Sequence, residues 1–142
     1  EARMLDGEPG EDRLDAPTVH GAPNPDDWPA ALLAYGLLMP TQPSWSLVAP
    51  HAGGPPRRMH VAGTLYDTGL GWPALVPGGR GEVPAALVPL RDPARLLPVL
   101  DEYEGPDYRR VRHTLADGTV CWVYAWVRST VGFRELPGGW PP

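Results

Sequence analysis

Lysine is absent from this chain of 142 residues, and all 12 of its basic side chains are arginine. This absence excludes Schiff-base chemistry and general-base catalysis by lysine. Cysteine is nearly absent, because the lone Cys121 can form neither an intramolecular disulfide nor a cysteine-based zinc site. Cys121 lies between Val120 and Trp122 in an apolar stretch with no cation beside it. We therefore expect a buried and unreactive thiol.

Long apolar runs are also missing. No stretch of about 18 apolar residues could span a membrane. The first residues are acidic and lack the apolar segment of a signal peptide. These two features predict a cytoplasmic protein. The exclusive use of arginine, with 20 prolines and 17 glycines, is typical of a bacterial genome rich in G and C.

Common catalytic signatures are missing too. The sequence holds no P-loop, no dinucleotide fingerprint, no His-Glu-x-x-His pair and no Gly-x-Ser-x-Gly turn. The four histidines, His20, His51, His60 and His113, do not have the close spacing of metal ligands. We expect no metal site and no bound cofactor.

The negative charge is concentrated at one end. Residues 1–28 carry eight acids and two arginines, a charge of −6, which leaves +1 of the total −5 for residues 29–142. A nearly neutral domain lacks the basic surface that binds nucleic acid or anionic lipid. Residues 1–28 are poor in large apolar side chains, so we expect a disordered acidic tail. The domain is expected over 29–130, followed by an irregular C-terminal tail over 131–142 that Trp140 could hold down.

Several segments have the composition of β-strands. Residues 119–127 are rich in β-branched and aromatic side chains on both faces, which predicts a strand covered on both sides. Residues 108–115 form a second strand, and Asp117-Gly118 between the two predicts a tight hairpin turn. Residues 61–66 and 83–90 are further candidates, although Pro84 and Pro89 favour an edge or a bulge for the latter. Residues 28–35 favour a helix by propensity alone.

A helix is predicted to begin at Asp92-Pro93, where an acid can cap the first turn and proline fits the first helical position. Its buried face is expected to hold Leu96, Leu97, Leu100 and Tyr103. Pro98 interrupts this segment and predicts a kink or two short helical turns.

Three motifs occur in a fixed order along the chain. The first is Ala34-Tyr35-Gly36-Leu37-Leu38, an apolar run that reaches a glycine. The second is Gly63-Thr-Leu-Tyr-Asp67, followed by Gly71-Trp-Pro-Ala74. The third is Leu100-Asp-Glu-Tyr-Glu-Gly105, followed by Tyr108-Arg-Arg110 and the hairpin. In this order and spacing, the set resembles the gamma-glutamylcyclotransferase-like family, which includes gamma-glutamylamine cyclotransferases and the butirosin-biosynthesis cyclotransferase.

The resemblance covers about residues 31–127 and implies an α+β fold, a small twisted mixed β-barrel with short flanking helices. On that basis residues 31–35 become the first strand rather than a helix. By position, Glu104 matches the catalytic glutamate and Tyr108 a tyrosine that lines the site. Tyr35, Gly36, Leu37 and Leu38 match the loop whose backbone holds the gamma-glutamyl group. The family releases 5-oxoproline from gamma-glutamyl amines or peptides without metal or cofactor, so the implied partner is a small molecule.

This chemistry suits a sparse site. The α-amine of the substrate attacks its own γ-carbonyl, so the nucleophile is already tethered and the protein mainly selects a folded conformer. A single carboxylate can take the proton from the amine and give it to the leaving nitrogen. Backbone N–H groups after Gly36 can stabilise the carbonyl oxygen as it becomes negative. Burial among apolar side chains would raise the pKa of Glu104 and suit it to both steps.

Some positions depart from the family pattern, and they keep two functions open. Leu37 replaces a serine or threonine, Trp72 replaces a tyrosine, and Ala85-Ala86 stand where Gly-Glu is frequent. The catalytic acid is retained, which favours an enzyme acting on a gamma-glutamyl amine or amide. The alternative is a catalytically inactive module of the same fold that binds a small molecule.

Glu104, Asp101 and Glu102 could also be ordinary exposed acids at a helix end. The Tyr35-Gly36 loop could be a plain turn. Arg109, Arg110 and Arg112 are expected to be solvated on the strand faces or paired with nearby acids. Trp122 and Trp126 are expected in the core.

Overall fold

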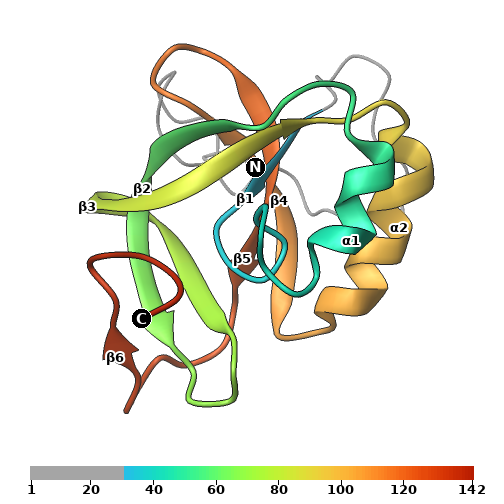
Figure 1. Cartoon of the computed structure of the whole chain (residues 1–142). Coiled ribbons are helices and arrows are strands. Elements are labelled where there is room, and N and C mark those ends of the chain that lie inside the picture. The colour runs from blue at the N-terminus through green and yellow to red at the C-terminus, as the bar shows by residue number, and fades with distance from the viewer. Residues whose placement is uncertain (1–30) are drawn as a thin grey trace, which may run out of the picture.

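One six-stranded sheet organises residues 31–142, the part of the chain described by this computed structural model (Figure 1). The strands run in the order β4-β5-β1-β3-β2-β6. Their bounds are β1 Ala31–Ala34, β2 Arg57–Asp67, β3 Pro73–Pro89, β4 Tyr108–Thr114, β5 Val120–Trp126 and β6 Arg134–Glu135. The acidic tail expected over 1–28 lies outside the described residues.

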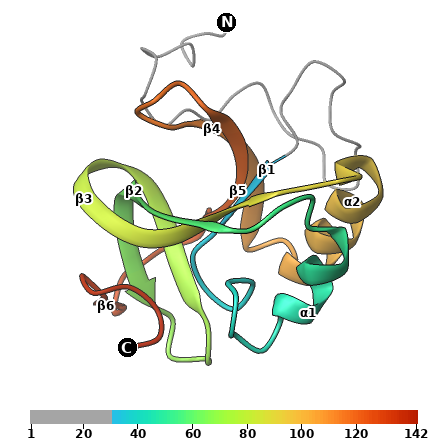
Figure 2. The ribbon, with the colours of Figure 1, turned by 45° about the horizontal axis from the view of Figure 1, so that its top comes forward.

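The sheet is mixed and curled. β1 pairs antiparallel with β3 and parallel with β5, while the long β2–β3 hairpin bends away from the helices (Figure 2). Opposite the step from Ala62 to Gly63, the register of β3 jumps from Glu82 to Pro77, so four residues of β3 bulge out. The outer strands β4 and β6 do not pair with one another within residues 31–142. The α+β fold is as predicted, but the barrel is an open half-barrel.

The core has two layers, one on each face of the sheet. Alternate residues of β1 enter opposite layers: Leu33 packs with Val61 and Val123 inside the curl, and Leu32 packs with Leu97 under the helices. β5 is buried on both faces in the same way. This explains why these strands are apolar along their whole length, as predicted for 119–127.

The turn between β4 and β5 also forms as predicted. The Gly118 N–H donates to the Leu115 carbonyl at 2.9 Å, and the Thr119 N–H donates to the Asp117 carboxylate at 2.9 Å. Gly118 has a φ of 89°, a conformation that glycine adopts without strain. Cys121 is buried next to this hairpin, as expected.

The expectation of an edge position for residues 83–90 is wrong. They form the second half of β3, which lies between β1 and β2 in the sheet. The two prolines are tolerated because β1 pairs only with residues 86–89, so Pro84 lies beyond its reach and Pro89 at its end. A bulge does occur, just before Pro84.

The main helix is α2, Pro93–Glu104, which covers the sheet together with the short helices α1, Trp45–Val48, and η1, Ala49–His51 (Figure 1). α2 is one continuous helix, so of the two alternatives predicted at Pro98 the division into two short helical turns is wrong. Pro98 removes a single backbone hydrogen bond, and burial of Leu96, Leu97 and Leu100 holds the helix together. Asp92 precedes the helix without a side-chain capping bond.

The C-terminal segment 131–142 is irregular for most of its length, yet it is attached to the sheet. Its residues Arg134 and Glu135 form β6 against the end of β2. The Leu136 N–H donates to the Leu65 carbonyl at 2.7 Å, and the Leu136 side chain is buried. Trp140 packs against the same core layer, as expected.

Candidate active site

A pocket of about 220 Å³ opens where β1 ends, between the start of β3 and the end of α2. Its walls are mainly apolar and aromatic, and Glu104 and Asp107 are their only charged residues among those that the structure describes. The lining residues are Leu33, Ala34, Tyr35, Gly36, Leu37, Leu38, Trp72, Pro73, Tyr103, Glu104, Asp107, Tyr108 and Tyr124.

The loop after β1 forms one wall of this pocket. Gly36 is required there by packing, because a Cβ atom at this position would lie 2.6 Å from Cγ of Pro73. The Gly36 carbonyl accepts the Met39 N–H at 3.0 Å, which closes the turn. Within residues 31–142, the N–H groups of Leu37 and Leu38 donate to no acceptor. The loop therefore offers two backbone donors beside the pocket.

Glu104 reaches the pocket because of helical periodicity. One face of α2 packs on the sheet, and it carries side chains at intervals of three or four residues: Leu97, Leu100, Asp101 and Glu104. Glu102 is exposed on the other side. The helix ends directly afterwards at Gly105, whose φ is 78°. Burial, with the nearby Asp101 carboxylate as a second cause, raises the pKa of Glu104 to about 7.

A buried polar cluster lies behind Glu104. The Arg110 guanidinium donates from Nε to Oδ1 of Asp101 at 2.9 Å and from Nη2 to Oδ2 at 3.1 Å. The Tyr124 hydroxyl donates to Oδ1 of Asp101 at 2.6 Å. Arg110 also stacks on the Trp122 ring at 4.3 Å. Asp101 is therefore a buried structural carboxylate rather than an exposed acid, and Arg110 is the one of the three strand arginines that pairs with it.

The tyrosine hydroxyls of the pocket are already engaged by the protein. Tyr35 donates to the Tyr124 carbonyl at 2.6 Å, and Tyr108 donates to the Pro73 carbonyl at 2.6 Å. Burial is the main cause of a raised pKa for Tyr35 and for Tyr108, and the Glu104 carboxylate is the second. Both phenols stay neutral at physiological pH. They tie together the strands around the pocket, and the N–H groups of Leu37 and Leu38 are donors that have no acceptor within residues 31–142.

All six residues that the sequence singled out lie at this one pocket: Tyr35, Gly36, Leu37, Leu38, Glu104 and Tyr108. Their catalytic and binding roles remain predictions. No group of three or more side chains of the metal-ligating types comes together within residues 31–142, and His20 lies outside the described residues. None of the helices described is both long and apolar enough to cross a membrane.

Sequence reasoning missed part of the pocket wall. Tyr103 was expected on the buried face of α2, but it is 43% exposed and lines the pocket, while Asp101 occupies the buried position. The spacing of Asp101 four residues after Leu97 was the available signal. Trp72, Pro73, Asp107 and Tyr124 also line the pocket. The signal for Trp72 and Pro73 was their place in the Gly71-Trp-Pro-Ala74 motif. Tyr124 lies directly opposite Arg110 in the β4–β5 register, which a register count from the Asp117-Gly118 turn could have indicated.

Comparison with known proteins identifies the fold. In solved structures, the chain is similar to a uropathogenic Escherichia coli-specific protein, with a TM-score of 0.63 and 21% identity over 76% of this chain and 87% of that one. It is also similar to an uncharacterized protein from Pyrococcus horikoshii, with a TM-score of 0.61 and 17% identity over 76% of this chain and 86% of that one.

Sequence comparison identifies the family. A protein of Halalkalibacterium halodurans named "putative gamma-glutamylcyclotransferase" is 43% identical over 92 residues, which are 58% of this chain and 81% of that protein. The sequence pattern of the family described as "Gamma-glutamyl cyclotransferase, AIG2-like" matches residues 32–141, which includes every residue of the pocket. The chain therefore belongs to the AIG2-like gamma-glutamyl cyclotransferase family.

Proposed function

We propose that this protein releases 5-oxoproline from a gamma-glutamyl amine or amide, with Glu104 as general base and general acid. The observation that carries the proposal is the position of Glu104, a carboxyl group whose pKa is raised to about 7, in the same pocket as two backbone N–H groups that have no acceptor within residues 31–142. A group with a pKa near 7 can both accept and return a proton at physiological pH.

The reaction needs no other reactant. The substrate α-nitrogen bonds to the γ-carbonyl carbon and closes a five-membered ring. Glu104 removes the proton that the attacking nitrogen loses. The carbonyl oxygen becomes negative and accepts hydrogen bonds from the N–H groups of Leu37 and Leu38. The bond from the carbonyl carbon to the leaving nitrogen then breaks, and Glu104 returns its proton to that nitrogen, which gives 5-oxoproline and a free amine.

The replacement of serine or threonine by Leu37 does not remove the backbone donor. The side chain of Leu37 is partly buried at the pocket wall, where it adds apolar surface in place of a hydroxyl. This change acts on substrate preference, whereas the proton transfer depends on Glu104.

The experiment is a screen of gamma-glutamyl amines and dipeptides for release of 5-oxoproline by the purified chain. Glu104→Gln is expected to lower kcat by about 10²–10⁴-fold, because glutamine keeps the size of the side chain but cannot transfer a proton. Glu102→Gln is the matched control, since Glu102 lies on the same helix with its side chain exposed. Asp101→Asn does not serve as a control, because it breaks a buried ion pair.

Two results would contradict the proposal. Turnover by Glu104→Gln at the wild-type rate would show that the reaction does not use this carboxylate. Absence of turnover across the panel, together with tight binding of 5-oxoproline, would identify a binding module that keeps the pocket without the reaction.

A further inference from the structure

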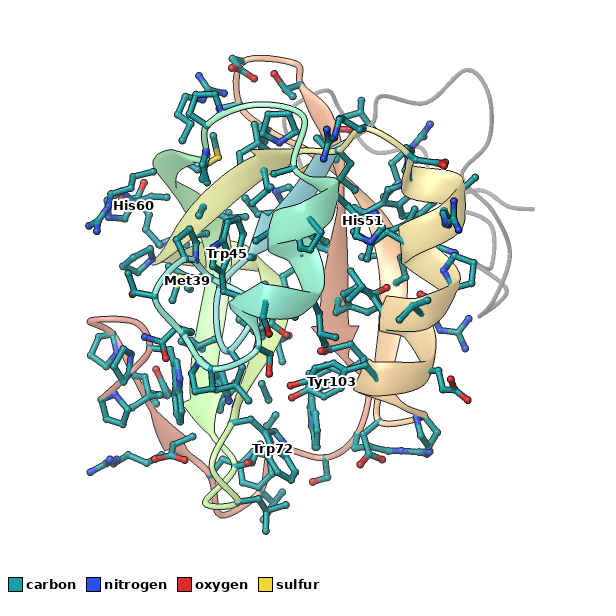
Figure 3. The ribbon with its side chains drawn as sticks, turned by 45° about the vertical axis from the view of Figure 1, so that its right-hand side comes forward. Met39, Trp45, His51, His60, Trp72 and Tyr103 are labelled. Atoms are coloured by element: carbon teal, nitrogen blue, oxygen red, sulfur yellow. The ribbon has the colours of Figure 1, made fainter. Side chains whose placement is uncertain are left out.

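Two aromatic side chains from different elements form the mouth of the pocket. Trp72 comes from the turn that precedes β3, and Tyr103 from the last turn of α2 (Figure 3). They are 39% and 43% exposed, whereas Tyr35, Tyr108 and Tyr124 deeper in the pocket are buried. The pocket therefore has a polar inner end at Glu104 and an apolar, solvent-facing outer end.

Both aromatic residues are held in place by hydrogen bonds. The Tyr103 hydroxyl lies 2.5 Å from Oγ of Ser44, which joins the end of α2 to the loop before α1. The backbone carbonyl of Trp72 accepts from the Thr68 hydroxyl at 2.7 Å and from the Thr68 backbone N–H at 3.4 Å, and these bonds close the turn that carries the indole. These bonds fix the Tyr103 side chain and the backbone that carries the Trp72 indole, so little of either segment has to be ordered when a ligand binds.

The charges around the mouth favour an uncharged ligand. No arginine or histidine is among the described residues that line the pocket, so a carboxylate there would find no cation. Asp107 is the charged residue other than Glu104, and its carboxylate already accepts from Nε of Arg128 at 3.0 Å. Arg128 is held by that contact and by the Pro106 carbonyl at 3.4 Å. A cationic ligand would therefore gain little from Asp107.

We infer that the leaving group is an aromatic or apolar amine that carries no carboxylate and no second ammonium group. Its apolar part is bound between Trp72 and Tyr103. This inference rests on the proposed function, which directs the gamma-glutamyl group to Glu104 and the loop at 36–38. The remainder of the substrate must then extend to the mouth. There an apolar group gains contact with two aromatic rings, while an amino-acid leaving group would bring a carboxylate into a site whose described lining holds Glu104 and no cationic side chain.

The test compares pairs of substrates that differ by one charge. Gamma-glutamyl phenethylamide and gamma-glutamyl phenylalanine differ only in a carboxylate, and gamma-glutamyl butylamide and its 4-aminobutyl analogue differ in an ammonium group. We expect kcat/KM for 5-oxoproline release to be at least about tenfold higher for the uncharged member of each pair. A preference for phenylalanine or for the 4-aminobutyl amide would overturn the inference while leaving the cyclotransferase reaction intact. Failure of all four substrates while another member of the gamma-glutamyl panel is turned over would overturn the inference alone, and failure across the whole panel would overturn the proposed function as well.

Variants of the turn locate the subsite. Trp72→Ala is expected to lower kcat/KM for the phenethylamide by about tenfold, with little effect on gamma-glutamyl methylamide, which is too short to reach the mouth. Trp72→Phe should restore most of the loss. Leu70→Ala is the control, because Leu70 lies on the same turn, is 65% exposed and does not line the pocket. Equal losses for the phenethylamide and the methylamide in a folded Trp72→Ala protein would show that Trp72 does not contact the leaving group.

Discussion

Three acidic residues within four positions of α2 have three different environments. Asp101 is buried against Arg110, Glu102 is exposed to solvent, and Glu104 lies at the pocket. The chemistry of the three side chains is almost the same, so their roles are set by the helical angle and by what faces each of them. A buried carboxylate that already has a cation remains ionised, while one without a cation holds its proton more strongly.

The environment of Glu104 predicts the pH dependence of the reaction. The pKa of Glu104 is raised to about 7, and the base must be ionised to remove a proton. We expect kcat/KM to be constant well above pH 7 and to fall about tenfold per pH unit below it. Steady-state rates of 5-oxoproline release between pH 5 and 9 measure this. If the acidic limb of the pH–rate profile lies instead near pH 4.5, the ordinary pKa of glutamate, Glu104 is solvated during the reaction.

A second variant separates the two causes of that raised pKa. Asp101→Asn removes the neighbouring negative charge, so the pKa of Glu104 should fall and the acidic limb should move to lower pH. The burial of Glu104 still raises its pKa, so the acidic limb should stay above pH 4.5. Glu102→Gln should leave the limb in place. Asp101→Asn leaves the buried Arg110 without its carboxylate partner, which destabilises the protein. The unfolding temperature of Asp101→Asn is therefore measured first, and the rates are measured at a temperature where this variant is folded. A limb that moves upward would contradict this assignment.

At the residue scale, the sequence predicted the pocket residues that belong to short motifs and missed those that depend on three-dimensional contacts. Tyr35, Gly36 and Glu104 were identified because each lies in a recognisable run of neighbours. The sequence did not predict that Asp101 pairs with Arg110, because no pattern between residues 101 and 110 indicates that β4 packs against α2. Gly36 was identified from its motif, and the structure adds a packing reason for it, because a Cβ atom there would lie 2.6 Å from Cγ of Pro73.

At the scale of elements, the predictions were accurate where composition and periodicity agreed. β5 and its hairpin with β4 follow from apolar faces and Asp117-Gly118. The proline rules were less reliable, because they treat each proline as if its strand or helix stood alone. In β3 the strand β1 ends before it reaches Pro84, which is paired only with β2, and in α2 tertiary packing compensates for Pro98.

The continuous helix α2 predicts that Pro98 lowers stability. Pro98→Ala restores an N–H donor for the Ala94 carbonyl and adds a better helix former. Part of this gain is offset because proline also restricts the unfolded chain. We expect the free energy of unfolding to rise by about 1–2 kcal/mol. Denaturant unfolding monitored by circular dichroism measures the change.

Val99→Ala provides the comparison for Pro98→Ala. Val99 is the next residue of α2 and is 51% exposed, so its replacement should change the free energy of unfolding by no more than about 0.5 kcal/mol. Because Pro98 does not line the pocket, kcat should stay at the wild-type value. Destabilisation by Pro98→Ala would indicate that the proline ring packs against the domain in a way that alanine cannot replace.

At the scale of the whole molecule, the pocket depends on strands that are distant in sequence. Tyr108 on β4 holds the start of β3 through the Pro73 carbonyl, and Tyr35 after β1 holds β5 through the Tyr124 carbonyl. These two bonds join residues 35 and 89 positions apart. The core layer inside the curl includes Leu33 and Tyr35 of the pocket wall, together with residues such as Leu136 that do not line the pocket. A change in that layer far from the pocket should therefore affect stability before it affects the reaction.

Leu136 provides the test of this separation. It belongs to a segment that composition described as an irregular tail, yet its side chain is 6% exposed and packs into the inner layer beside β6. Leu136→Ala should lower the free energy of unfolding by about 2–4 kcal/mol, because it removes buried apolar surface and leaves a cavity. The kcat for 5-oxoproline release at 25 °C should stay within about twofold of the wild-type value, since Leu136 does not line the pocket. Leu70→Ala, at a 65% exposed position, should leave both quantities unchanged. An unfolding free energy equal to that of the wild type would mean that residues 136–142 do not pack on the domain in solution, whereas a large loss of kcat in the folded variant would mean that the two layers of the core are coupled through the sheet.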